Sequence, residues 1–230
     1  MNILITGANR GLGLEMAKQS IASGHTVFAT ARNPNAADEL NATGATVLPC
    51  DVSDPASVEA MAKAVGDAPI DVLINNAGLF ADSKTPTMWE LTPEQLLDTY
   101  KANCLGPWLV TRALEDHVAR SERKLIVHIS SYMGSLQHAI NDGADAHLAY
   151  RSSKTALNML HVCMANALRK KHAGLTAIVM HPGWVQTDMG GEQAPLQIPD
   201  AVGRILKTVH SVKADEHGSF IDLDHNEMPW

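Results

Sequence analysis

The sequence predicts an α/β protein with one doubly wound parallel sheet and helices on both of its faces. Two observations predict this class. Short apolar runs alternate with longer stretches of helical periodicity, and a glycine-rich loop directly follows the first apolar run. The chain has 230 residues, of which 45% are apolar and 19% charged, so we expect one folded domain over residues 1–230.

Six short runs are typical of strands. Four of them, the first and the fourth to sixth, are nearly continuous apolar segments, as parallel strands covered on both faces require. Strands are expected at Asn2–Ile5, Thr26–Ala29, Thr46–Leu48, Val72–Ile74, Lys124–Ile129 and Thr176–Met180. With helices between them, these strands form right-handed crossovers, and ligands then bind at the carboxyl ends of the strands.

Five stretches between or after the strands have helical periodicity. Asp54-Pro55 is typical of a helix start, Thr92 with Gln95 forms a capping box, and Gly174 follows a basic segment as a helix stop. Helices are expected at Gly11–Ser23, Pro55–Val65, Pro93–Ala119, Tyr150–Lys171 and Asp200–Val212.

Charge and cysteine content exclude several classes of protein. The formal net charge is −7, which argues against a nucleic-acid surface. No apolar run reaches the length of a membrane span, and the first residues already form a strand pattern rather than a targeting segment. The three cysteines are scattered, which suits a reducing compartment, so we expect a cytoplasmic protein.

The histidines do not predict a metal site. The chain has 11 of them, but they are dispersed and none forms a HExxH pattern. His217 and His225 lie near aspartates in the sequence without a recognised ligand spacing. No metal is therefore expected.

The loop after the first strand predicts a dinucleotide site of the Rossmann type. Its glycines let the main chain approach a pyrophosphate, and the following helix N-terminus offers free N–H groups to it. The residues expected to bind the cofactor here are Gly7, Asn9, Arg10, Gly11, Leu12 and Gly13.

The end of the second strand predicts NADP(H) rather than NAD(H). An acid about 20 residues after the glycine loop would bind the ribose 2′-hydroxyl. That position holds Ala31, followed by Arg32, so no carboxylate repels a 2′-phosphate. Arg32 pairs with such a phosphate, and Arg10 is a second candidate. The other interpretation is that both arginines are solvated surface cations.

Two further strand ends fit the same site. Asp51-Val52 follows the third strand, where a carboxylate accepts a hydrogen bond from an adenine amino group or simply begins a helix. Asn76, Ala77 and Gly78 follow the fourth strand and suit a close approach of the backbone to a ribose, although a plain turn also fits them.

The fifth strand and the long helix after it predict acid–base chemistry. Tyr150 and Lys154 are four residues apart and therefore share one helix face. An ammonium beside a phenol favours the phenolate, which makes Tyr150 a candidate general acid/base. Ser131 ends the fifth strand and is placed to hydrogen-bond a substrate oxygen. An ordinary surface Tyr–Lys pair is the alternative.

Taken together, these motifs resemble the short-chain dehydrogenase/reductase family. The order TGxxxGxG, NNAG, NxxG, SxxG, YxxxK and a late PG runs nearly from end to end, at Thr6–Gly13, Asn75–Gly78, Asn103–Gly106, Ser131–Gly134, Tyr150–Lys154 and Pro182-Gly183. The segments after Tyr150 and His181, and the ending Met228-Pro229-Trp230, are similar to the C-factor/sniffer branch of carbonyl reductases.

The resemblance implies an NADPH-dependent reductase of aldehydes or ketones. It implies that Tyr150 protonates the carbonyl oxygen, Ser131 holds that oxygen, and Lys154 holds the nicotinamide ribose and lowers the tyrosine pKa. Asn103 then anchors a water that links Lys154 to solvent. Further cofactor contacts are implied at Pro182, Gly183, Val185 and Thr187, the last to the carboxamide.

The family pattern also implies a quaternary structure, and the chain departs from it in two places: an insertion after Ser131 and a short segment, Asp188–Ile198, after Thr187. The long helices 93–119 and 150–171 are expected to pair in a homodimer or homotetramer. The segment between Ser131 and Tyr150 is longer than in many family members, and we expect a polar loop at the mouth of the substrate pocket or a plain surface insertion. Misplacement of Ser131 by this insertion would remove its expected role.

Two other functions are weighed against the reductase. A cofactor-binding sensor or signalling protein could use this fold with little turnover. The complete set of Tyr150, Lys154, Ser131 and Asn103 argues for catalysis. An NAD-dependent alcohol oxidation is the other alternative, against which Ala31 and Arg32 argue.

Overall fold

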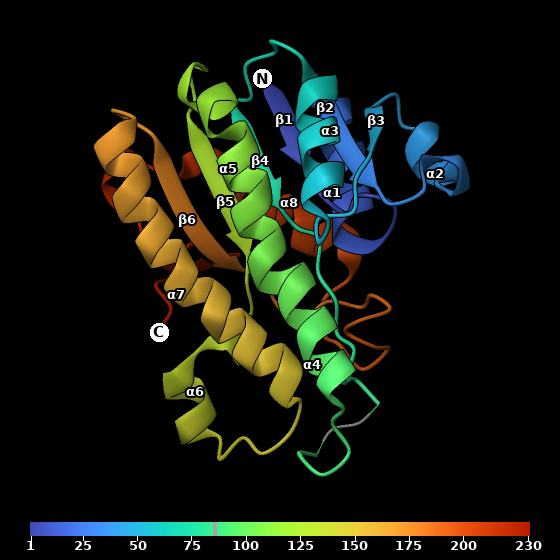
Figure 1. Cartoon of the computed structure of the whole chain (residues 1–230), viewed down its shortest axis with the longest axis vertical. Helices are drawn as coiled ribbons and strands as arrows, with labels where there is room; N and C mark the ends of the chain where they lie inside the picture. The colour runs from blue at the N-terminus through green and yellow to red at the C-terminus, as the bar shows by residue number, and fades with distance from the viewer. Residues whose placement is uncertain (85–86) are drawn as a thin grey trace.

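The computed structural model describes residues 1–84 and 87–230, and its centre is one parallel sheet (Figure 1). The strands lie in the order β3-β2-β1-β4-β5-β6-β7. Their bounds are β1 (Asn2–Ile5), β2 (Thr26–Ala31), β3 (Thr46–Pro49), β4 (Val72–Asn75), β5 (Leu125–Ile129), β6 (Thr176–His181) and β7 (Phe220–Asp222). Every neighbouring pair of these strands is parallel, with Ile3 opposite both Val27 and Val72.

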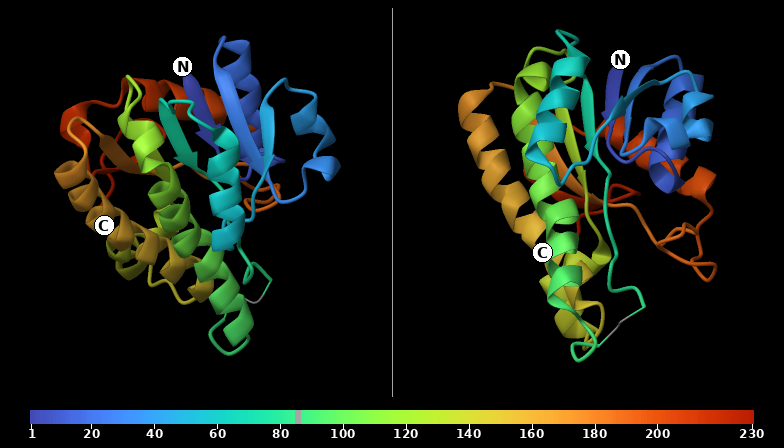
Figure 2. Two further views of the ribbon diagram at one scale, coloured as in Figure 1. Left: turned by 45° about the horizontal axis from the view of Figure 1, so that its top comes forward. Right: turned by 45° about the vertical axis from the view of Figure 1, so that its right-hand side comes forward.

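Helices cover both faces of the sheet, as Figure 2 shows. They are α1 (Gly11–Ala22), α2 (Asp38–Asn41), α3 (Pro55–Val65), α4 (Pro93–Tyr100), α5 (Gly106–Ala119), α6 (Leu136–Asn141), α7 (Leu148–Lys171) and α8 (Ile198–Ser211). The pair α1 and α8 packs on one face, and α3, α5 and α7 pack on the other. This confirms the doubly wound α/β class.

Alternation along each strand builds two separate cores. In β1, Ile3 and Ile5 point to the core beneath α1 and α8, whereas Leu4 points to the core beneath α3, α5 and α7. β4 repeats the pattern, with Leu73 in the second core. Because both faces are buried, the strands need apolar residues at every position, which explains their continuous apolar runs.

The order in which strands are added to the sheet changes side between β1 and β4, and this switch point sets the position of the cleft. β1, β2 and β3 step outward, after which β4 returns to the other side of β1. Thr6 and Asn76, which follow these two central strands, are joined because the main-chain N–H of Asn76 donates to Thr6 Oγ1 at 3.0 Å. In such sheets the crevice at this reversal is the ligand site.

Several predicted elements differ from the structure. The helix expected over 93–119 is interrupted by a π-helical turn at Lys101–Leu105. The expected polar loop after Ser131 contains α6, and the catalytic helix candidate begins at Leu148 rather than Tyr150. The short elements α2 and β7 are absent from the prediction, because three or four residues carry too little periodicity to be recognised.

Across the two described ranges, none of the helices combines the length and apolar character needed to cross a bilayer.

Candidate active site

The glycine loop between β1 and α1 is packed too tightly for side chains. Gly7 and Gly11 have φ of +64° and +54°, which favour glycine. A Cβ on Gly13 would lie 2.4 Å from the Gly7 carbonyl oxygen. The Asn76 side chain fixes the loop by donating to the carbonyl oxygens of Thr6 and Gly7, at 2.9 and 3.1 Å. The loop is therefore a rigid main-chain cradle.

The cradle opens into a cleft of about 750 Å³ along the carboxyl ends of the strands. Most of the residues predicted to bind the cofactor line this cleft. They are Gly7, Asn9, Arg10, Gly11, Leu12, Gly13, Arg32, Asp51, Val52, Asn76, Ala77, Gly78, Tyr150, Lys154, Pro182 and Thr187. No described side chain caps α1 at Arg10, so its first N–H groups remain available at the cradle.

Four residues predicted for the site are not among those that line the cleft. They are Asn103, Ser131, Gly183 and Val185, and Val185 is buried in the core beneath α8. The wall also includes residues that the motifs do not mark: Cys50, Ser53, Leu79, Asp98, Lys101, Ala102, Ile129, Ser130, Asp188 and Met189. For most of them the available signal was a position at or after the end of β3, β4, β5 or β6, whereas Asp98, Lys101 and Ala102 come from α4 and the π-helical turn.

The two candidate arginines have different surroundings. Arg10 forms an ion pair with Asp188, at 2.7 Å between Nη1 and Oδ2, so its charge is already engaged across the cleft. Arg32 is exposed at the end of β2, and its charge helps to keep the pKa of Asp51 low, after the larger effect of the Ser53 hydroxyl. Of the two, Arg32 is the better placed to meet a phosphate.

Asp51 serves the local chain in this structure. Its Oδ1 accepts hydrogen bonds from the Ser53 main-chain N–H at 2.9 Å and from the Ser53 hydroxyl at 2.6 Å. Both bonds favour the ionised carboxylate, which is why the pKa of Asp51 is lowered. The second lining residue of this turn, Val52, is largely buried against Gly106.

The side chains of Tyr150 and Ser131 lie close together, although the insertion separates the residues by 19 positions. Tyr150 lines the cleft, whereas Ser131 lies behind its lining. Burial raises the pKa of Tyr150 to about 12, and the neighbouring Ser131 hydroxyl offsets only part of that rise. The longer segment therefore leaves Ser131 beside the tyrosine.

Lys154 lies one turn further along α7 and is 4% exposed. Its Nζ donates to the Ile129 carbonyl oxygen at 2.7 Å and lies 5.7 Å from the centroid of the Tyr150 ring. Burial lowers the pKa of Lys154 to about 8. The Tyr150 pKa is raised rather than lowered as expected, because desolvation of the phenol is the largest effect on it.

Asn103 lies in the π-helical turn between α4 and α5 and is fully buried. Its Oδ1 accepts from the Leu79 main-chain N–H at 2.7 Å, and its Nδ2 donates to Leu79 O at 2.8 Å and to Ser153 Oγ at 3.0 Å. A side-chain amide has two donor hydrogens and two acceptor lone pairs. Among the described contacts, one lone pair on Oδ1 is left for a further partner.

Gly78 explains how Asn103 and Lys154 share one corner of the site. A Cβ at this position would lie 3.3 Å from Asn103 Oδ1 and 3.8 Å from Lys154 Nζ. The glycine therefore leaves a gap that both polar groups face.

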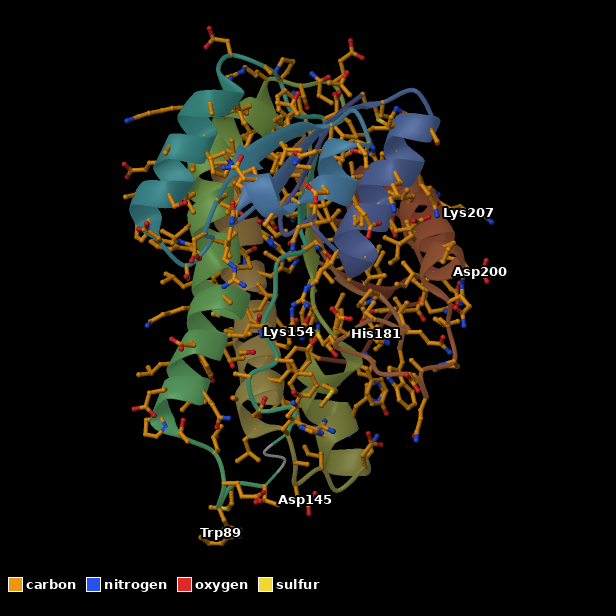
Figure 3. The ribbon with its side chains drawn as sticks, turned by 90° about the vertical axis from the view of Figure 1, so that its right-hand side faces the viewer. Trp89, Asp145, Lys154, His181, Asp200 and Lys207 are labelled. Atoms are coloured by element: carbon orange, nitrogen blue, oxygen red, sulfur yellow. The ribbon has the colours of Figure 1, made fainter. Side chains whose placement is uncertain are left out.

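In Figure 3, Lys154 and His181 lie in the middle of the molecule, whereas Trp89 and Asp145 lie at one end.

The insertion forms a small structured unit beside the site. Ser135 caps α6 by accepting from the His138 main-chain N–H at 3.1 Å. The Tyr132 ring stacks on the His138 ring at 3.9 Å between centroids, and the Trp230 main-chain oxygen accepts from Gln137 N at 3.0 Å. Leu136 and Ile140 remain exposed on its surface, so the expected polar loop is partly apolar.

The segment after β6 is held by hydrogen bonds within itself. The Thr187 hydroxyl accepts from Gly190 N at 3.1 Å, and Trp184 Nε1 donates to Gly190 O at 2.8 Å. Thr187 also lies 3.6 Å from the position that a Cβ on Gly11 would take. This segment therefore forms the wall of the cleft opposite the glycine loop.

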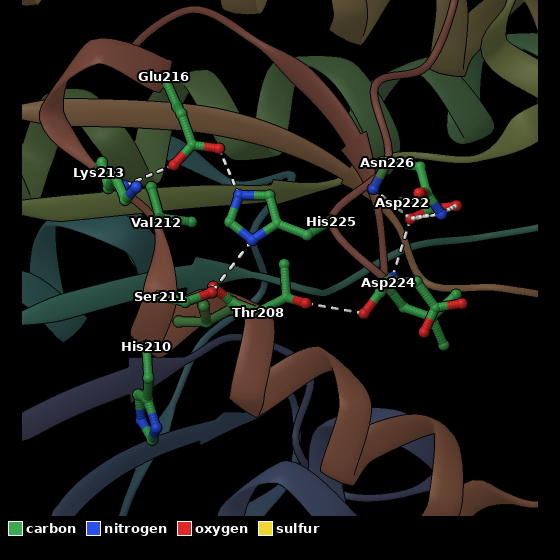
Figure 4. A network of polar contacts seen from close by, with 12 residues as sticks. Thr208, His210, Ser211, Val212, Lys213, Glu216, Asp222, Asp224, His225 and Asn226 are labelled. Carbon is green, nitrogen blue, oxygen red and sulfur yellow. Dashed lines mark hydrogen bonds and ion pairs between the residues drawn. The ribbon is translucent and has the colours of Figure 1, made fainter.

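The two C-terminal histidines considered as metal ligands are engaged in local hydrogen bonds, and Figure 4 shows those of His225. His225 lies between the Ser211 hydroxyl and the Glu216 carboxylate, and His217 Nε2 contacts Ala165 O at 2.8 Å. In residues 1–84 and 87–230, no group of three or more histidine, cysteine or acidic side chains is arranged to hold a metal ion.

Comparison with known proteins adds a family to this geometry. The family model described as short chain dehydrogenase matches residues 1–197. The C-signal protein of Myxococcus xanthus is 37% identical over 173 residues, which cover 75% of this chain and all of that protein. An uncharacterized oxidoreductase of Schizosaccharomyces pombe is 32% identical over 254 residues, covering 98% of this chain and 96% of that protein.

Solved structures agree over the whole chain. The NADPH-bound carbonyl reductase from chicken fatty liver has 31% sequence identity and a TM-score of 0.90, covering 100% of this chain and 98% of that one. The carbonyl reductase Sniffer of Drosophila melanogaster has 29% identity and a TM-score of 0.89, covering 100% and 99% of the two chains.

Proposed function

The chain belongs to the short-chain dehydrogenase family, and we propose that it is an NADPH-dependent reductase that transfers a hydride to an aldehyde or ketone carbonyl, reversibly with the alcohol. The observation that carries this proposal is the buried pair Tyr150 and Lys154, which lie one turn apart on α7 and line the cleft, with Ser131 beside the tyrosine. The similar structures of the chicken and Drosophila carbonyl reductases support the same reaction.

The cleft fits a nicotinamide dinucleotide. Gly7 and Gly13 leave no room for a Cβ, which suits the close approach of a pyrophosphate to the helix N-terminus, whereas a Cβ on Gly11 would contact Thr187 alone. Arg32 is proposed to bind the 2′-phosphate, Asp51 and Val52 the adenine side, and Asn76 to Gly78 the ribose side. Thr187 is proposed to bind the carboxamide. NADPH, when bound, supplies the hydride.

Tyr150 is proposed to give its phenolic proton to the carbonyl oxygen. Because its pKa is raised to about 12, the phenol is protonated at neutral pH, which suits the reductive direction. Ser131 donates a hydrogen bond to the same oxygen and stabilises the negative charge that develops on it. Both hydroxyls are held before substrate arrives, so little reorganisation is needed.

Lys154 and Asn103 are proposed to support that proton transfer. A lysine with a pKa of about 8 is still mainly charged at pH 7, so Lys154 can hold a ribose hydroxyl and favour the tyrosine anion after the proton leaves. The free lone pair on Asn103 Oδ1 faces the same corner as Lys154 Nζ, which suits a water that returns a proton from solvent.

A sensor or signalling protein is the alternative, and one relative bears the name C-signal. The two functions differ in turnover. Purified protein is mixed with NADPH or NADH and a panel of aldehydes, quinones, diketones and bulky ketones, and cofactor oxidation is followed. Turnover with NADPH that is lost in Tyr150→Phe and kept in Tyr100→Phe supports the reductase. Tight NADPH binding without turnover on any carbonyl supports the sensor.

We also propose a homodimer or homotetramer that forms through the helices over 93–119 and 150–171. A groove of about 360 Å³ between α4, α5 and α7 is lined mainly by apolar side chains. Leu97 beside it is 58% exposed and Met159 on α7 is 67% exposed. Sedimentation should give a multiple of the chain mass for the wild type, and Leu97→Glu should shift it to the monomer.

Residues 1–230 are further proposed to fold as one domain in the cytoplasm. The seven named strands of the described residues, which span residues 2 to 222, all belong to one sheet. Cys50, Cys104 and Cys163 are free thiols, which suits a reducing compartment.

A further inference from the structure

Helix α7, which carries Tyr150, begins without a cap of its own. Its N-cap residue is His147, which has a left-handed φ of 58° and makes no side-chain capping bond in the described structure. The first N–H groups of a helix have no partner within it, and a buried helix start needs another acceptor. For α7, whose Ala149 and Tyr150 are buried, that acceptor must come from elsewhere in the chain.

Asp82 supplies it from 67 positions earlier in the sequence. The carboxylate is fully buried, and its Oδ2 accepts from Ala149 N at 2.8 Å while Oδ1 accepts from Tyr150 N at 3.3 Å. These are the bonds that an N-cap side chain makes in an ordinary helix. Among the described ion pairs, none involves Asp82, and its described side-chain partners are the two main-chain N–H groups at the positive end of the helix.

The residues around Asp82 hold the same turn in two more ways. The Asp82 main-chain oxygen contacts His147 Nδ1 at 3.2 Å. The Phe80 ring lies 4.4 Å from the Tyr150 ring and 4.9 Å from the His147 ring, between centroids. The short segment Leu79–Asp82 therefore touches the first turn of α7 through a carboxylate, a carbonyl and an aromatic face.

The other end of this segment is fixed to the site as well. The Leu79 main-chain N–H donates to Asn103 Oδ1 at 2.7 Å, and Asn103 Nδ2 donates to the Leu79 carbonyl oxygen at 2.8 Å. Asn103 also donates to Ser153 Oγ, which in turn donates to the Tyr150 carbonyl oxygen at 2.7 Å. The segment cannot shift without disturbing contacts on both sides of the tyrosine.

We propose that Asp82 is a positioning residue for the reduction, because it caps the first turn of α7 from a distant loop and so fixes the position of Tyr150 in the cleft. This inference rests on the proposed role of Tyr150 as proton donor. The expected effect is large, because a misplacement of about 1 Å in a catalytic group costs as much as about a hundredfold in rate.

Three variants test the proposal. Asp82→Ala removes the cap, Asp82→Asn keeps one acceptor oxygen, and Asp54→Ala is the matched control. Asp54 caps α3 by accepting from Ala56 N at 3.0 Å, away from the tyrosine. The measurements are kcat and KM for a carbonyl substrate, the Kd of NADPH, the thermal midpoint, and amide hydrogen exchange of the peptide that contains Ala149 and Tyr150.

The expected result is a split between rate and binding. Asp82→Ala should lower kcat by about 30-fold, with NADPH Kd within about twofold of wild type and faster exchange in the first turn of α7. Asp82→Asn should recover part of the lost kcat. Asp54→Ala should lower the thermal midpoint without a change in kcat, because its helix does not carry the tyrosine.

Two results would overturn the proposal: a wild-type kcat in Asp82→Ala, or unchanged exchange at the first turn of α7. If Asp82→Ala does not fold, Asp82→Asn decides by the same two readouts. If the wild type turns over no carbonyl, the proposed function fails, and the exchange experiment alone decides whether Asp82 holds the helix.

Discussion

The two halves of the cleft are built in different ways. At the nucleotide half, eight consecutive residues, Thr6–Gly13, form the cradle, and what matters is main chain and the absence of side chains. At the chemical half, side chains from distant stretches come together: Ser131 lies beside Tyr150, and Asn103 donates to Ser153 Oγ on the same helix. The first kind of site is local in the sequence, whereas the second depends on the whole fold.

The halves also differ in their exposure to water. Arg10 and Asp188 at the nucleotide half have side chains 68% and 76% exposed, so their attraction is screened. Tyr150 and Lys154 are buried, and their pKa values move in opposite directions, because burial disfavours the charged form of each. Charge at the nucleotide half therefore serves recognition, and charge at the chemical half serves reactivity.

The largest expected effect tests whether the chemical half can be damaged alone. Ser131→Ala should lower kcat by about a hundredfold or more, because it removes a donor to the developing oxyanion. NADPH affinity, measured by fluorescence titration, should stay within about twofold, since the cradle is unchanged. Ser131→Thr, which keeps the hydroxyl, should recover activity. An equal loss of affinity and rate in Ser131→Ala would contradict this separation.

The converse variant damages the nucleotide half. Gly13→Ala would place a Cβ 2.4 Å from Gly7 O and 2.6 Å from Asn76 Nδ2. The loop must move, and NADPH Kd should rise by about 30-fold, or about 2 kcal/mol. Titration of NADPH checks this. The control is Gly203→Ala in α8, where the nearest contact is at 3.7 Å, and it should bind normally. Equal Kd values for the two variants would contradict the cradle.

A smaller effect separates the two arginines. Arg32→Ala should reduce the preference for NADPH over NADH by about tenfold, as loss of a charged hydrogen bond to phosphate predicts. Arg10→Ala should weaken both cofactors alike, because the guanidinium pairs with Asp188. The ratio of kcat/KM for the two cofactors is the measurement. A larger change of the ratio in Arg10→Ala than in Arg32→Ala would reverse the assignment.

The smallest effect concerns stability and the buried histidines near the chemical half. Burial lowers the pKa of His128 to about 3 and that of His181 to about 4, and it also lowers the pKa of His161. All three are neutral in the fold but bind protons near pH 6.5 once unfolded. Stability is therefore full above pH 6.5 and falls as the pH decreases below it, by about 1 kcal/mol per histidine per pH unit.

Urea unfolding at pH 7.5 and pH 5.5 checks this. His128→Gln should reduce the difference in unfolding free energy between the two pH values by about one third of the histidine contribution, since one of three groups is removed. Tyr100→Phe serves as a control that leaves the titrating groups intact. An unchanged pH difference in His128→Gln would show that other groups cause the acid loss.

The sequence predicts the nucleotide half better than the chemical half for a physical reason. The glycine loop and the six principal strands follow from patterns within a few residues, and the structure has them. Tyr150 and Lys154 are found because they lie on one turn of a helix. Asp82 has no local signal, because an ordinary N-cap lies beside its helix in the sequence and this one does not.

Two further differences have similar causes. The pairing of Arg10 with Asp188 joins residues 178 positions apart, which no periodicity reveals. The π-helical turn that carries Asn103 has hydrogen bonds between residues five apart instead of four. This small change hardly alters the apolar pattern, so residues 93–119 are predicted as one continuous helix. Element type was predictable over most of the chain, but contacts between distant elements were not.

The segment after β6, which contains Asp188 and forms one wall of the cleft, has a consequence for folding during protein synthesis. The glycine loop leaves the ribosome early, yet the segment opposite it follows β6 and is made only after about four fifths of the chain. The strands β1, β2 and β3 can pair before that point, but a complete dinucleotide cleft does not exist until the segment after β6 arrives. A cofactor that prefers the finished cleft therefore stabilises the completed protein and gives little help to nascent chains.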